Sequence, residues 1–527
     1  MIKATIKRVA LVPLVFSLLG VSIPTFVPTS WVNIEPISWE PLAWPGMDVT
    51  VESKPEPIDV TSVEGIIGQR ILNLNTPVQA RYVTVPGSEA LNFATVNVIK
   101  TAIADQEVVS GVAYQPEAHS PGAGLGDRGC VVGSTDWDST DIIDDQRLGV
   151  SSSSGVAVVC DVFYAGGSVL AQKLRTVTID NKVVVKDSSV VVYHDVNSDA
   201  SLLANELWND DAAQYLWDAF IAVVKRDAGA IGLTWVSSTP DEEIIAQVLN
   251  GTIVRPDATL IVTFPPGVVD PELQAVGIEA TESEMTIGFP EQIVSQLLSD
   301  FGKHVLETVR SGVSFQPTYV WAGNADVDCR LHACVALTYD DGPSPEYTPG
   351  ILDAFAANHA SATFFVLGSE TVANPEIVAR AHNEGHLVHN HSWSHKELTK
   401  ISAGEIASEI NQTNTALYDV TGVVPTTFRP PYGSVNEKIL SIANMPAILW
   451  DVDTNDWQGP EEDVLIERAV NHAVPGSIVL QHDVHANTAN TVWEVIAGMR
   501  DRGFMVVNLE QLFGGEMPTS GVISNAY

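Results

Sequence analysis

Basic residues are scarce in this chain. Among its 527 residues, 27 Lys and Arg stand against 65 Asp and Glu, so the formal net charge at pH 7 is −38. Such a surplus of negative charge argues against nucleic-acid binding and does not favour attachment to an anionic membrane surface. The acids are spread along the chain and form no acidic tail. We therefore interpret the charge as a contribution to solubility and not as the sign of a partner.

An apolar run near the N-terminus indicates export. It extends over residues 9–27 and follows basic residues at positions 3, 7 and 8. This is the layout of a secretory signal or of an uncleaved membrane anchor. As a helix, the run would span about 28 Å, close to the hydrocarbon thickness of a bilayer. Pro13 and Pro24 disfavour a straight spanning helix, yet no small-x-small cleavage site is evident. Cleavage and anchoring therefore both stay open.

Cysteine is also sparse, with four residues in the whole chain. An even number in an oxidising compartment predicts two disulfides, for which three pairings exist. Proximity along the chain favours Cys130–Cys160 and Cys329–Cys334. The second pair encloses His332, so a metal site is an alternative there. That alternative is less favoured, because a thiolate zinc site usually has four close ligands.

The length of the chain predicts two or three domains, and 45% hydrophobic residues are enough to form complete cores. No convincing internal repeat is found. The expected division is residues 1–30 as signal peptide or membrane anchor, 31–60 as a Pro- and Trp-rich stalk, 61–310 as an α+β accessory domain, 311–334 as a linker, 335–514 as an α/β catalytic domain, and 515–527 as a tail.

The predicted accessory domain mixes strands and helices. A strand is expected over Val156–Tyr164, and a hairpin over Thr176–Val185 that turns at Asp180–Asn181. Apolar residues at helical spacing predict helices over Leu202–Arg226 and Glu291–Val309. No constellation of catalytic residue types occurs in this region. The sequence therefore indicates an α+β fold here and leaves its role open.

From Val335 onward, short β-rich runs alternate with helical patterns. The expected strands are Val335–Tyr339, Ala362–Val366, His386–His389, Thr426–Arg429, Ala447–Val452, Ser477–Leu480 and Met505–Leu509. Seven strands with helices between them predict parallel pairing, and the number favours a barrel over an open sheet. In such barrels the chemistry lies on loops at the C-terminal ends of the strands.

Two adjacent acids, Asp340 and Asp341, end the first expected strand. Neighbouring side chains at a strand end point in opposite directions, so one acid can hold a metal while the other accepts a proton. Asp-Gly-Pro is also ordinary turn chemistry, so the motif alone is weak.

Two histidines, His391 and His395, follow the third expected strand. A spacing of four places both imidazoles on one face of a helical turn. Two imidazoles and one carboxylate leave one tetrahedral position open, as in a catalytic zinc site. A polar loop that happens to contain histidines is the alternative, and the carboxylate pair at another strand end makes it less favoured.

Further polar clusters end the fourth, fifth and sixth expected strands. Arg429 can hold a carboxylate by a bidentate contact and keep it ionised. Two prolines follow it and leave the amide of Tyr432 free to point at a ligand. The fifth strand ends in the acids and aromatic residue of Asp451–Trp457, and the sixth supplies His482. All five clusters fall where a barrel places its active site.

The ordered motifs TYDDGP, HSWSH, RPPYG, DTNDW and LQHD resemble those of the polysaccharide deacetylases, carbohydrate esterase family four, with the NodB homology domain. The resemblance covers residues 335–513. It implies a distorted (β/α)7 barrel as the catalytic domain, preceded here by the α+β accessory domain. Family members remove N- or O-acetyl groups from sugars by means of a divalent metal.

The resemblance also implies residue roles. Asp341, His391 and His395 would bind the metal. Asp340 would be the general base, and His482 would be the general acid that protonates the leaving nitrogen.

Five further residues would support this chemistry. Arg429 would tune the base, and Asp456 would orient the acid. The Tyr432 amide would polarise the acetyl carbonyl together with the metal, while Trp457 and Leu480 would line the sugar groove and the acetate pocket. Zinc suits such a ligand set, and cobalt or another divalent ion is an alternative.

The expected function is that of an exported or envelope-attached deacetylase of an N-acetylated glycan. Peptidoglycan is favoured, because the N-terminal segment would keep the enzyme at the cell envelope. A chitin-oligomer deacetylase and an acetyl-xylan esterase are alternatives within the family. From another class, the chain could be a carbohydrate-binding or sensing protein with an inactive barrel. The presence of every ligand, base and acid type argues against that. The sequence predicts no oligomeric state.

Overall fold

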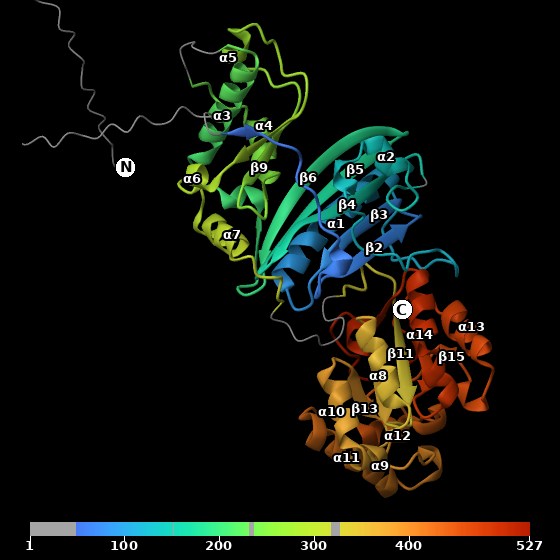
Figure 1. Ribbon diagram of the computed structural model, residues 1–527. Helices are drawn as coiled ribbons and strands as arrows, with labels where there is room; N and C mark the ends of the chain where they lie inside the picture. The colour runs from blue at the N-terminus through green and yellow to red at the C-terminus, as the bar shows by residue number, and fades with distance from the viewer. Residues whose placement is uncertain (1–48, 151, 231–236, 318–326) are drawn as a thin grey trace, which may run out of the picture. The chain divides into compact units, whose positions relative to one another are not determined.

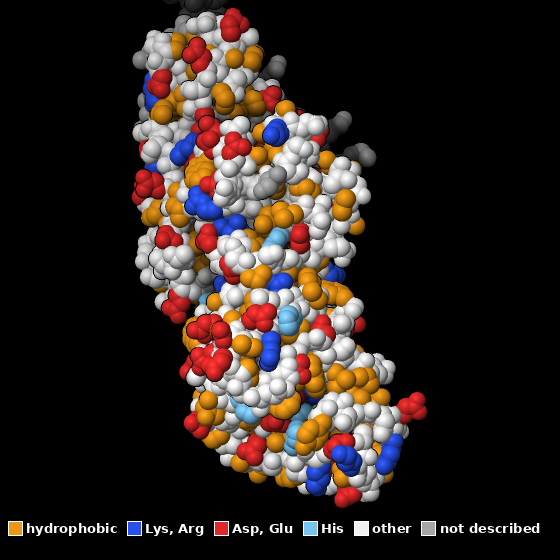
Figure 2. Space-filling view, turned by 90° about the vertical axis from the view of Figure 1, so that its right-hand side faces the viewer, with side chains coloured by type: hydrophobic (Ala, Val, Ile, Leu, Met, Phe, Trp, Pro, Cys, Tyr) orange, Lys and Arg blue, Asp and Glu red, His pale blue; other side chains and the backbone are white. Residues whose placement is uncertain are grey.

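The structure, a computed structural model, describes residues 49–150, 152–230, 237–317 and 327–527 (Figure 1). The predicted signal or anchor, most of the predicted stalk and part of the predicted linker lie outside these residues. Within the described ranges, no helix is both long and apolar enough to cross a membrane. On the face seen in Figure 2, acidic side chains are scattered among hydrophobic and neutral ones.

A six-stranded sheet forms the first part of the accessory region. Its order is β2 (Ile67–Asn73), β3 (Val78–Thr84), β4 (Gly155–Gly166), β5 (Val169–Asp180), β6 (Val183–Asp195) and β7 (Ala200–Leu203). Every neighbouring pair is antiparallel except β3 and β4. A parallel pair needs a crossover connection, and helix α1 (Glu89–Ser110) lies in that connection. Ile99 and Ile103 of α1 pack with strand residues in one buried cluster.

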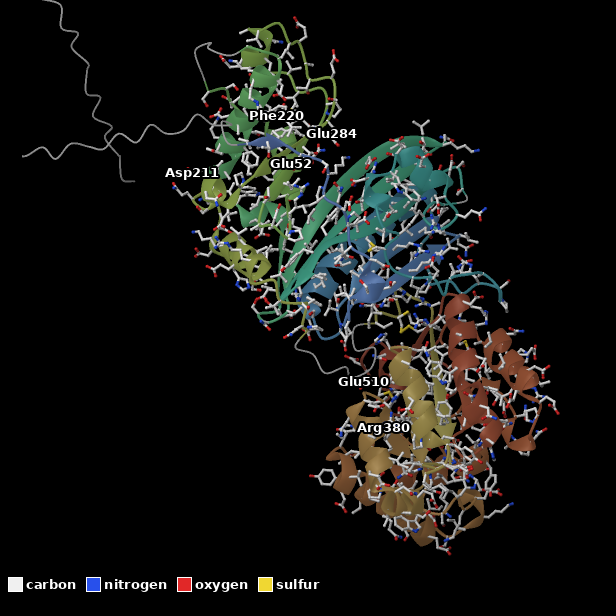
Figure 3. All side chains as sticks on the ribbon, in the orientation of Figure 1. Glu52, Asp211, Phe220, Glu284, Arg380 and Glu510 are labelled. Carbon is white, nitrogen blue, oxygen red and sulfur yellow. A yellow bond between two sulfur atoms is a disulfide. The ribbon has the colours of Figure 1, made fainter. Side chains whose placement is uncertain are left out.

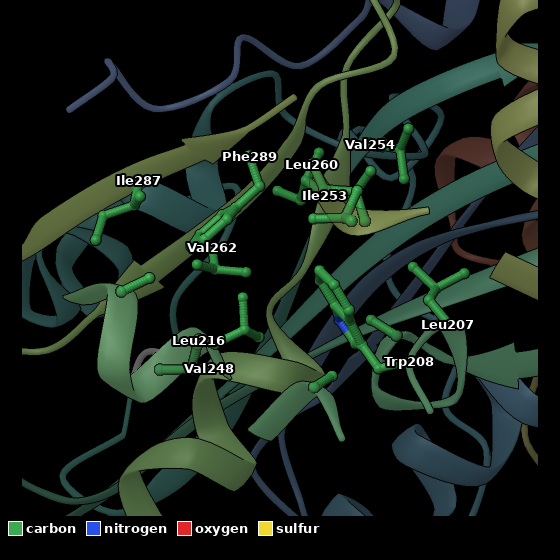
Figure 4. Packing of buried hydrophobic residues seen from close by; sticks show 14 of the residues in the cluster. Leu207, Trp208, Leu216, Val248, Ile253, Val254, Leu260, Val262, Ile287 and Phe289 are labelled. Atoms are coloured by element: carbon green, nitrogen blue, oxygen red, sulfur yellow. The ribbon is translucent and has the colours of Figure 1, made fainter. Parts of the chain in front are cut away.

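A smaller four-stranded sheet forms the second part. Its order is β1 (Thr50–Val51), β10 (Met285–Phe289), β9 (Leu260–Phe264) and β8 (Ile253–Val254). The helices of this part are α3 (Ala212–Asp227), α4 (Glu242–Asn250), α5 (Pro271–Gln274), α6 (Glu291–Val294) and α7 (Asp300–Ser311). Leu216 of α3 and Val248 of α4 share a core with Val262 and Phe289 (Figure 4). Phe220, which extends from α3 (Figure 3), stacks on Phe264 with ring centroids 4.0 Å apart.

The strands expected in the accessory region are present, and both expected helices are shorter. The hairpin turns at Asn181–Lys182, one residue later than predicted, since both residues are left-handed. Leu202–Leu203 pairs as part of β7, so the first helix begins only at Ala212. The second is interrupted because Leu298 bridges to another segment and Ser299 caps a new helix.

The C-terminal region is an α/β fold in which every strand pair is parallel. Its strands are β11 (Cys334–Asp340), β12 (Thr363–Val366), β13 (Leu387–Asn390), β14 (Ala447–Ile448), β15 (Val452–Asp453), β16 (Ile478–His482), β17 (Met505–Val507) and β18 (Val522–Ile523). The main order is β13-β12-β11-β16-β15, with β17 beside the start of β11 and β14 beside β18. The central strand β11 is buried along its whole length, as expected for a strand covered on both faces.

Helices connect these parallel strands, as crossover geometry requires. They are α8 (Thr348–Ala357), α9 (Gly368–Ala373), α10 (Pro375–Asn383), α11 (Ala403–Thr421), α12 (Glu437–Ala443), α13 (Glu462–His472), α14 (Ala486–Asp501) and α15 (Leu509–Leu512). Phe355 of α8 packs edge-on against Tyr339 of β11, and both are fully buried. On the outer side, Arg380 of α10 pairs with Asp353 and Glu384 (Figure 3).

The strand expected over Thr426–Arg429 is reduced to isolated bridges. Phe428 bridges in parallel to Asn390 at the end of β13 and to Ala447 of β14. The prolines at 430 and 431 cannot donate to a ladder, which limits its length. The strand expected over Ala447–Val452 is split into β14 and the start of β15. These bridges connect the β13 edge to β14, which leads directly into β15.

Both predicted disulfides are confirmed. Cys130 pairs with Cys160, and Cys329 pairs with Cys334 at the start of β11. All four cysteines are thus oxidised. The alternative of a thiolate metal site around His332 is wrong, because no cysteine there is left to supply a thiolate.

Candidate metal centre and active site

The polar clusters gather at the carboxyl ends of parallel strands. β11 ends at Asp340, β13 at Asn390 and β16 at His482, and their registers place Asp340 opposite His482. Because parallel strands end at one edge of the sheet, residues far apart in sequence meet there. The predicted ligands Asp341, His391 and His395 form one cluster whose ligand atoms all lie within 4.8 Å of one another.

The two adjacent acids have different partners. Asp340, 3% exposed, is the last residue of β11, and its Oδ1 accepts a hydrogen bond of 2.9 Å from Arg429 Nη1. Asp341 leaves the strand in a left-handed conformation (φ 76°). Its Oδ1 lies 3.4 Å from His391 Nε2 and 3.3 Å from His395 Nε2. One acid therefore faces a buried guanidinium and the other faces two imidazoles.

The separations between the three ligand atoms fit a divalent metal. Ligands about 2.0–2.1 Å from a tetrahedral ion lie about 3.4 Å from one another, close to the two distances between Asp341 Oδ1 and the imidazoles. Asp341 Oδ1 is buried and has no hydrogen-bond partner among the described residues. Buried acceptors are normally satisfied, so an acceptor directed at two imidazole nitrogens suits a cation. His391, His395 and Asp341 therefore form a candidate metal site.

The charge states of this cluster favour a cation. Burial alone would raise the pKa of Asp341, but the contact with His391 and the charges of His391, His395 and His482 lower it to about 2. Burial lowers the pKa of His391, yet Asp340 and Asp341 outweigh burial and raise it. Burial is the main cause of the lowered pKa of His395. The carboxylates thus create a negative potential where a positive charge is stabilised.

A backbone carbonyl fixes the tautomer of His391. Its Nδ1 donates to the Arg429 carbonyl oxygen at 2.7 Å, which leaves Nε2, the nitrogen beside Asp341, as the one that can bind a metal. Metal-binding histidines commonly use the second ring nitrogen in this way. The contact also ties the end of β13 to the segment that carries Arg429.

The loop that carries the histidines is not helical. The sequence predicted that His391 and His395 share one face of a helical turn; instead, Ser392 (φ 70°) and His395 (φ 56°) are left-handed and the segment is irregular. The prediction of a helical turn is therefore wrong. The two imidazoles still meet, with ring centroids 5.1 Å apart.

A buried glutamate that the sequence did not indicate holds this loop. Glu409 of α11, 4% exposed, accepts hydrogen bonds from the N–H and the hydroxyl of Ser394, both at 2.8 Å. It also pairs with Lys396 at 2.9 Å. Asn390 Oδ1 accepts from Ser392 N, and Asn390 Nδ2 donates to α11. Nothing in the local pattern links Glu409 to the histidines, because the contact is tertiary.

Arg429 meets Asp340 through one nitrogen only. Nη1 donates to Asp340 Oδ1 and to Thr338 Oγ1, while Nε and Nη2 donate to the carbonyls of Ile448 and Leu449. The bidentate contact considered from the sequence is therefore wrong. The reason is that the other donors of the guanidinium satisfy the carbonyls of the last residue of β14 and of the residue that follows it.

His482, which is partly buried, pairs with the buried Asp456. His482 Nδ1 lies 2.8 Å from Asp456 Oδ1, and the His482 N–H donates to Asp456 Oδ2 at 2.6 Å. Thr488 donates to the same oxygen. Burial would lower the pKa of His482, but the hydrogen bond and charge of Asp456 raise it to about 9. Burial raises the pKa of Asp456, and His482 outweighs that effect and lowers it. The pair is an imidazolium and a carboxylate at neutral pH.

The remaining predicted residues differ in exposure. The ring of Tyr432, 66% exposed, packs edge-on against His395 with centroids 4.6 Å apart. Trp457 is 58% exposed, whereas Leu480 is buried. Tyr432 and Trp457 thus present aromatic surface that a sugar ring could contact. The substrate roles of all three stay predictions.

Replacement of His391 should remove the metal. We expect wild-type chain to hold close to one equivalent of divalent metal after dialysis. His391→Ala should hold far less, because the site loses one of its three protein ligands. Metal content by mass spectrometry measures this. His472→Ala is the control, since His472 is exposed and pairs only weakly with Glu467. An unchanged metal content in His391→Ala would contradict the assignment.

The pKa of His482 should depend on Asp456. In metal-free wild-type chain, NMR titration of His482 should give a pKa of about 9. In Asp456→Asn the hydrogen-bonded charge is removed while burial remains, so the pKa should fall below that value. The protonated fraction at pH 8 then decreases. A pKa that does not move in Asp456→Asn would show that the pair does not control this proton.

Comparison with known proteins agrees with these motifs. A family model described as polysaccharide deacetylase matches residues 328–446. The chain is 42% identical over 183 residues to the peptidoglycan-N-acetylglucosamine deacetylase PgdA of Listeria monocytogenes, covering 35% of this chain and 39% of that protein. It is 37% identical over 186 residues to a peptidoglycan-N-acetylglucosamine deacetylase of Bacillus cereus, covering 34% of this chain and 68% of that protein.

A solved structure of the peptidoglycan deacetylase PdaC from Bacillus subtilis is 39% identical, with a TM-score of 0.35, and the match covers 36% of this chain and 93% of that one. The chain thus covers only about two fifths of the Listeria relative but more than two thirds of the Bacillus cereus relative. Because it is 37% identical to the Bacillus cereus relative over that length, the chain belongs to the polysaccharide deacetylase family, carbohydrate esterase family four.

Proposed function

We propose that this chain is an exported, metal-dependent deacetylase that hydrolyses N-acetyl groups of peptidoglycan N-acetylglucosamine. The observation that carries the proposal is the convergence of three groups at one sheet edge: a candidate metal cluster, a buried acid beside Arg429, and the His482–Asp456 pair. The choice of peptidoglycan is supported by the names of the relatives and by the apolar N-terminal run.

Asp341, His391 and His395 would hold the metal, which we take to be zinc from its preference for imidazole and carboxylate ligands, with cobalt or another divalent ion as the alternative. Such an ion, when bound, supplies a Lewis acid for the acetyl carbonyl and lowers the pKa of water. The remaining steps are carried by the chain's own groups.

Asp340 would act as the general base. Its Oδ2 lies 3.7 Å from His391 Nε2, so it borders the ligand cluster. Asp340 would take a proton from the attacking water while the water oxygen bonds to the acetyl carbon. Arg429 supports this role, because a fixed guanidinium at 2.9 Å orients the carboxylate.

His482 would act as the general acid. With a pKa of about 9, His482 is protonated at neutral pH. In the parallel pairing of β11 and β16 it lies opposite Asp340, at the same edge of the sheet. As the C–N bond breaks, the imidazolium would give its proton to the departing nitrogen, so that acetate and a free amine result. The Tyr432 amide would stabilise the negative oxygen of the intermediate. Trp457 and Leu480 would contact the sugar and the acetyl group.

We further infer the distorted (β/α)7 barrel for the catalytic domain, residues 335–514. The bridges of Phe428 to Asn390 and Ala447 support closure, because they connect the β13 edge toward β15. The α+β accessory domain would bind wall polymer or hold the barrel away from the membrane. An accessory region that binds wall polymer would retain glycan by itself, whereas one that only holds the barrel away from the membrane would not.

Acetate release from three substrates tests the proposal. Full chain loaded with zinc is incubated with peptidoglycan, chitin oligomers and acetylated xylan, and released acetate and the masses of the glycan fragments are measured. We expect release from peptidoglycan, with loss of acetyl groups from N-acetylglucosamine. The rate should fall at alkaline pH, where His482 loses the proton that Asp456 helps it to hold.

The other outcomes separate the alternatives. Release from chitin oligomers alone would indicate a chitin-oligomer deacetylase, and release from xylan alone would indicate an esterase. No release from any substrate, with the metal bound and glycan binding retained, would contradict the proposal and favour a carbohydrate-binding protein with an inactive barrel.

A further inference from the structure

Asp483 is a buried carboxyl group that the proposed chemistry does not use. It follows His482 at the end of β16 and is 1% exposed. Because consecutive side chains at a strand end point in opposite directions, Asp483 faces away from the His482–Asp456 pair. Its contacts lie instead on the turn that follows Asp341.

A hydrogen-bond relay connects Asp483 to this turn. Thr348 Oγ1, at the start of α8, donates to Asp483 Oδ2 at 2.5 Å. The same hydroxyl accepts a hydrogen bond of 2.8 Å from Ser344 N. Thr348 is itself 1% exposed. The carboxyl group thus acts, through one hydroxyl, on the backbone just beyond the Asp341–Gly342–Pro343 segment.

The turn also packs directly on the carboxyl group. A Cβ atom placed on Gly342 would lie 2.2 Å from Asp483 Oδ2 and 2.3 Å from Oδ1. The backbone of Gly342 therefore lies against the carboxyl group, at a distance that no other residue allows. On its other side, the Gly342 carbonyl accepts from Leu367 N at 3.0 Å. The residue next to Asp341 is held between these two contacts.

Asp341 needs such support. Its φ of 76° is a left-handed conformation, which is unfavourable for a non-glycine residue and persists only where the surroundings enforce it. This conformation aims Oδ1 at His391 and His395. A small relaxation of the turn would move the oxygen away from both imidazoles.

We propose that Asp483 is a positioning residue for the metal ligand Asp341, acting through Gly342 and through the Thr348–Ser344 relay. Its contacts lie on Gly342 and Thr348 and not on the three proposed ligand side chains. The dipeptide His482–Asp483 thus serves both sides of the site: the first residue supplies the proposed acid and the second fixes the turn that carries a ligand. The inference rests on the metal site of the proposed function, and metal affinity tests it separately from turnover.

Three variants and one control test the inference. Asp483→Ala removes the carboxyl group, Asp483→Asn keeps an acceptor for Thr348, and Thr348→Val removes the relay without changing its shape. Thr491→Val is the matched control, because Thr491 is equally buried on a helix and its hydroxyl donates only within α14. Zn²⁺ affinity of the full chain is measured by competition with a chromophoric chelator, beside the visible spectrum of the Co²⁺ form and the unfolding temperature without metal.

We expect Asp483→Ala to weaken Zn²⁺ binding about 10- to 100-fold, as loss of an outer-shell partner commonly does. Thr348→Val should weaken it in the same direction, and both should change the Co²⁺ spectrum. Asp483→Asn should recover most of the affinity, and Thr491→Val should match the wild type. The comparison of Thr348→Val with Thr491→Val does not depend on whether Asp483→Ala folds well.

Wild-type Zn²⁺ affinity in both Asp483→Ala and Thr348→Val would overturn the inference. So would a loss confined to Asp483→Ala that is matched by a lower unfolding temperature, since that pattern reflects stability alone. A wild-type chain that binds no Zn²⁺ would overturn it as well. If the wild type binds Zn²⁺ but releases no acetate, the proposed function fails, while the affinities of the variants still decide this inference.

Discussion

The buried guanidinium of Arg429 is the group on which the candidate site depends. No part of it is exposed, and a charge in that position is stable only when it is paired and fully hydrogen-bonded. Its donors reach Asp340 and Thr338 of β11 and the carbonyl of Ile448 in β14. Its own carbonyl accepts from His391. One residue thus orients the proposed base and fixes the tautomer of a proposed metal ligand, so the positions of both groups depend on Arg429.

Near Arg429, adjacent residues have different roles because their side chains point in different directions. Asp340 continues β11 and faces the guanidinium, whereas Asp341 turns left-handed and faces two imidazoles. At the opposite strand end, His482 pairs with Asp456 while Asp483 lies against the turn of Asp341. The alternation of side chains at strand ends allows both divisions. The resulting charges differ accordingly, with a carboxylate at the ligand position and an imidazolium at the acid position.

The sequence predicted the residues at the strand ends but not what holds them. Clusters such as Asp340–Asp341 follow buried runs, and parallel pairing brings such ends together, so local pattern was sufficient. The helical turn predicted for His395 failed because spacing carries no information about the tertiary bonds from Glu409 that hold this loop left-handed. The strand predicted around Phe428 is reduced to isolated bridges, because the two prolines that follow cannot donate to a ladder. The site residues were predictable because each cluster directly follows a strand-like run in the sequence. The residues that hold them in place were not, because their contacts join elements that are far apart in the sequence.

The central claim is that Asp340 and Asp341 act separately, one on a proton and the other on the metal. The most direct test measures metal content and acetate release together in Asp340→Asn and Asp341→Asn. We expect Asp340→Asn to keep its metal and to lose at least about 10²-fold in turnover, as removal of a general base does. Asp341→Asn should lose the metal. Full turnover in Asp340→Asn, or full metal content in Asp341→Asn, would contradict this division of roles.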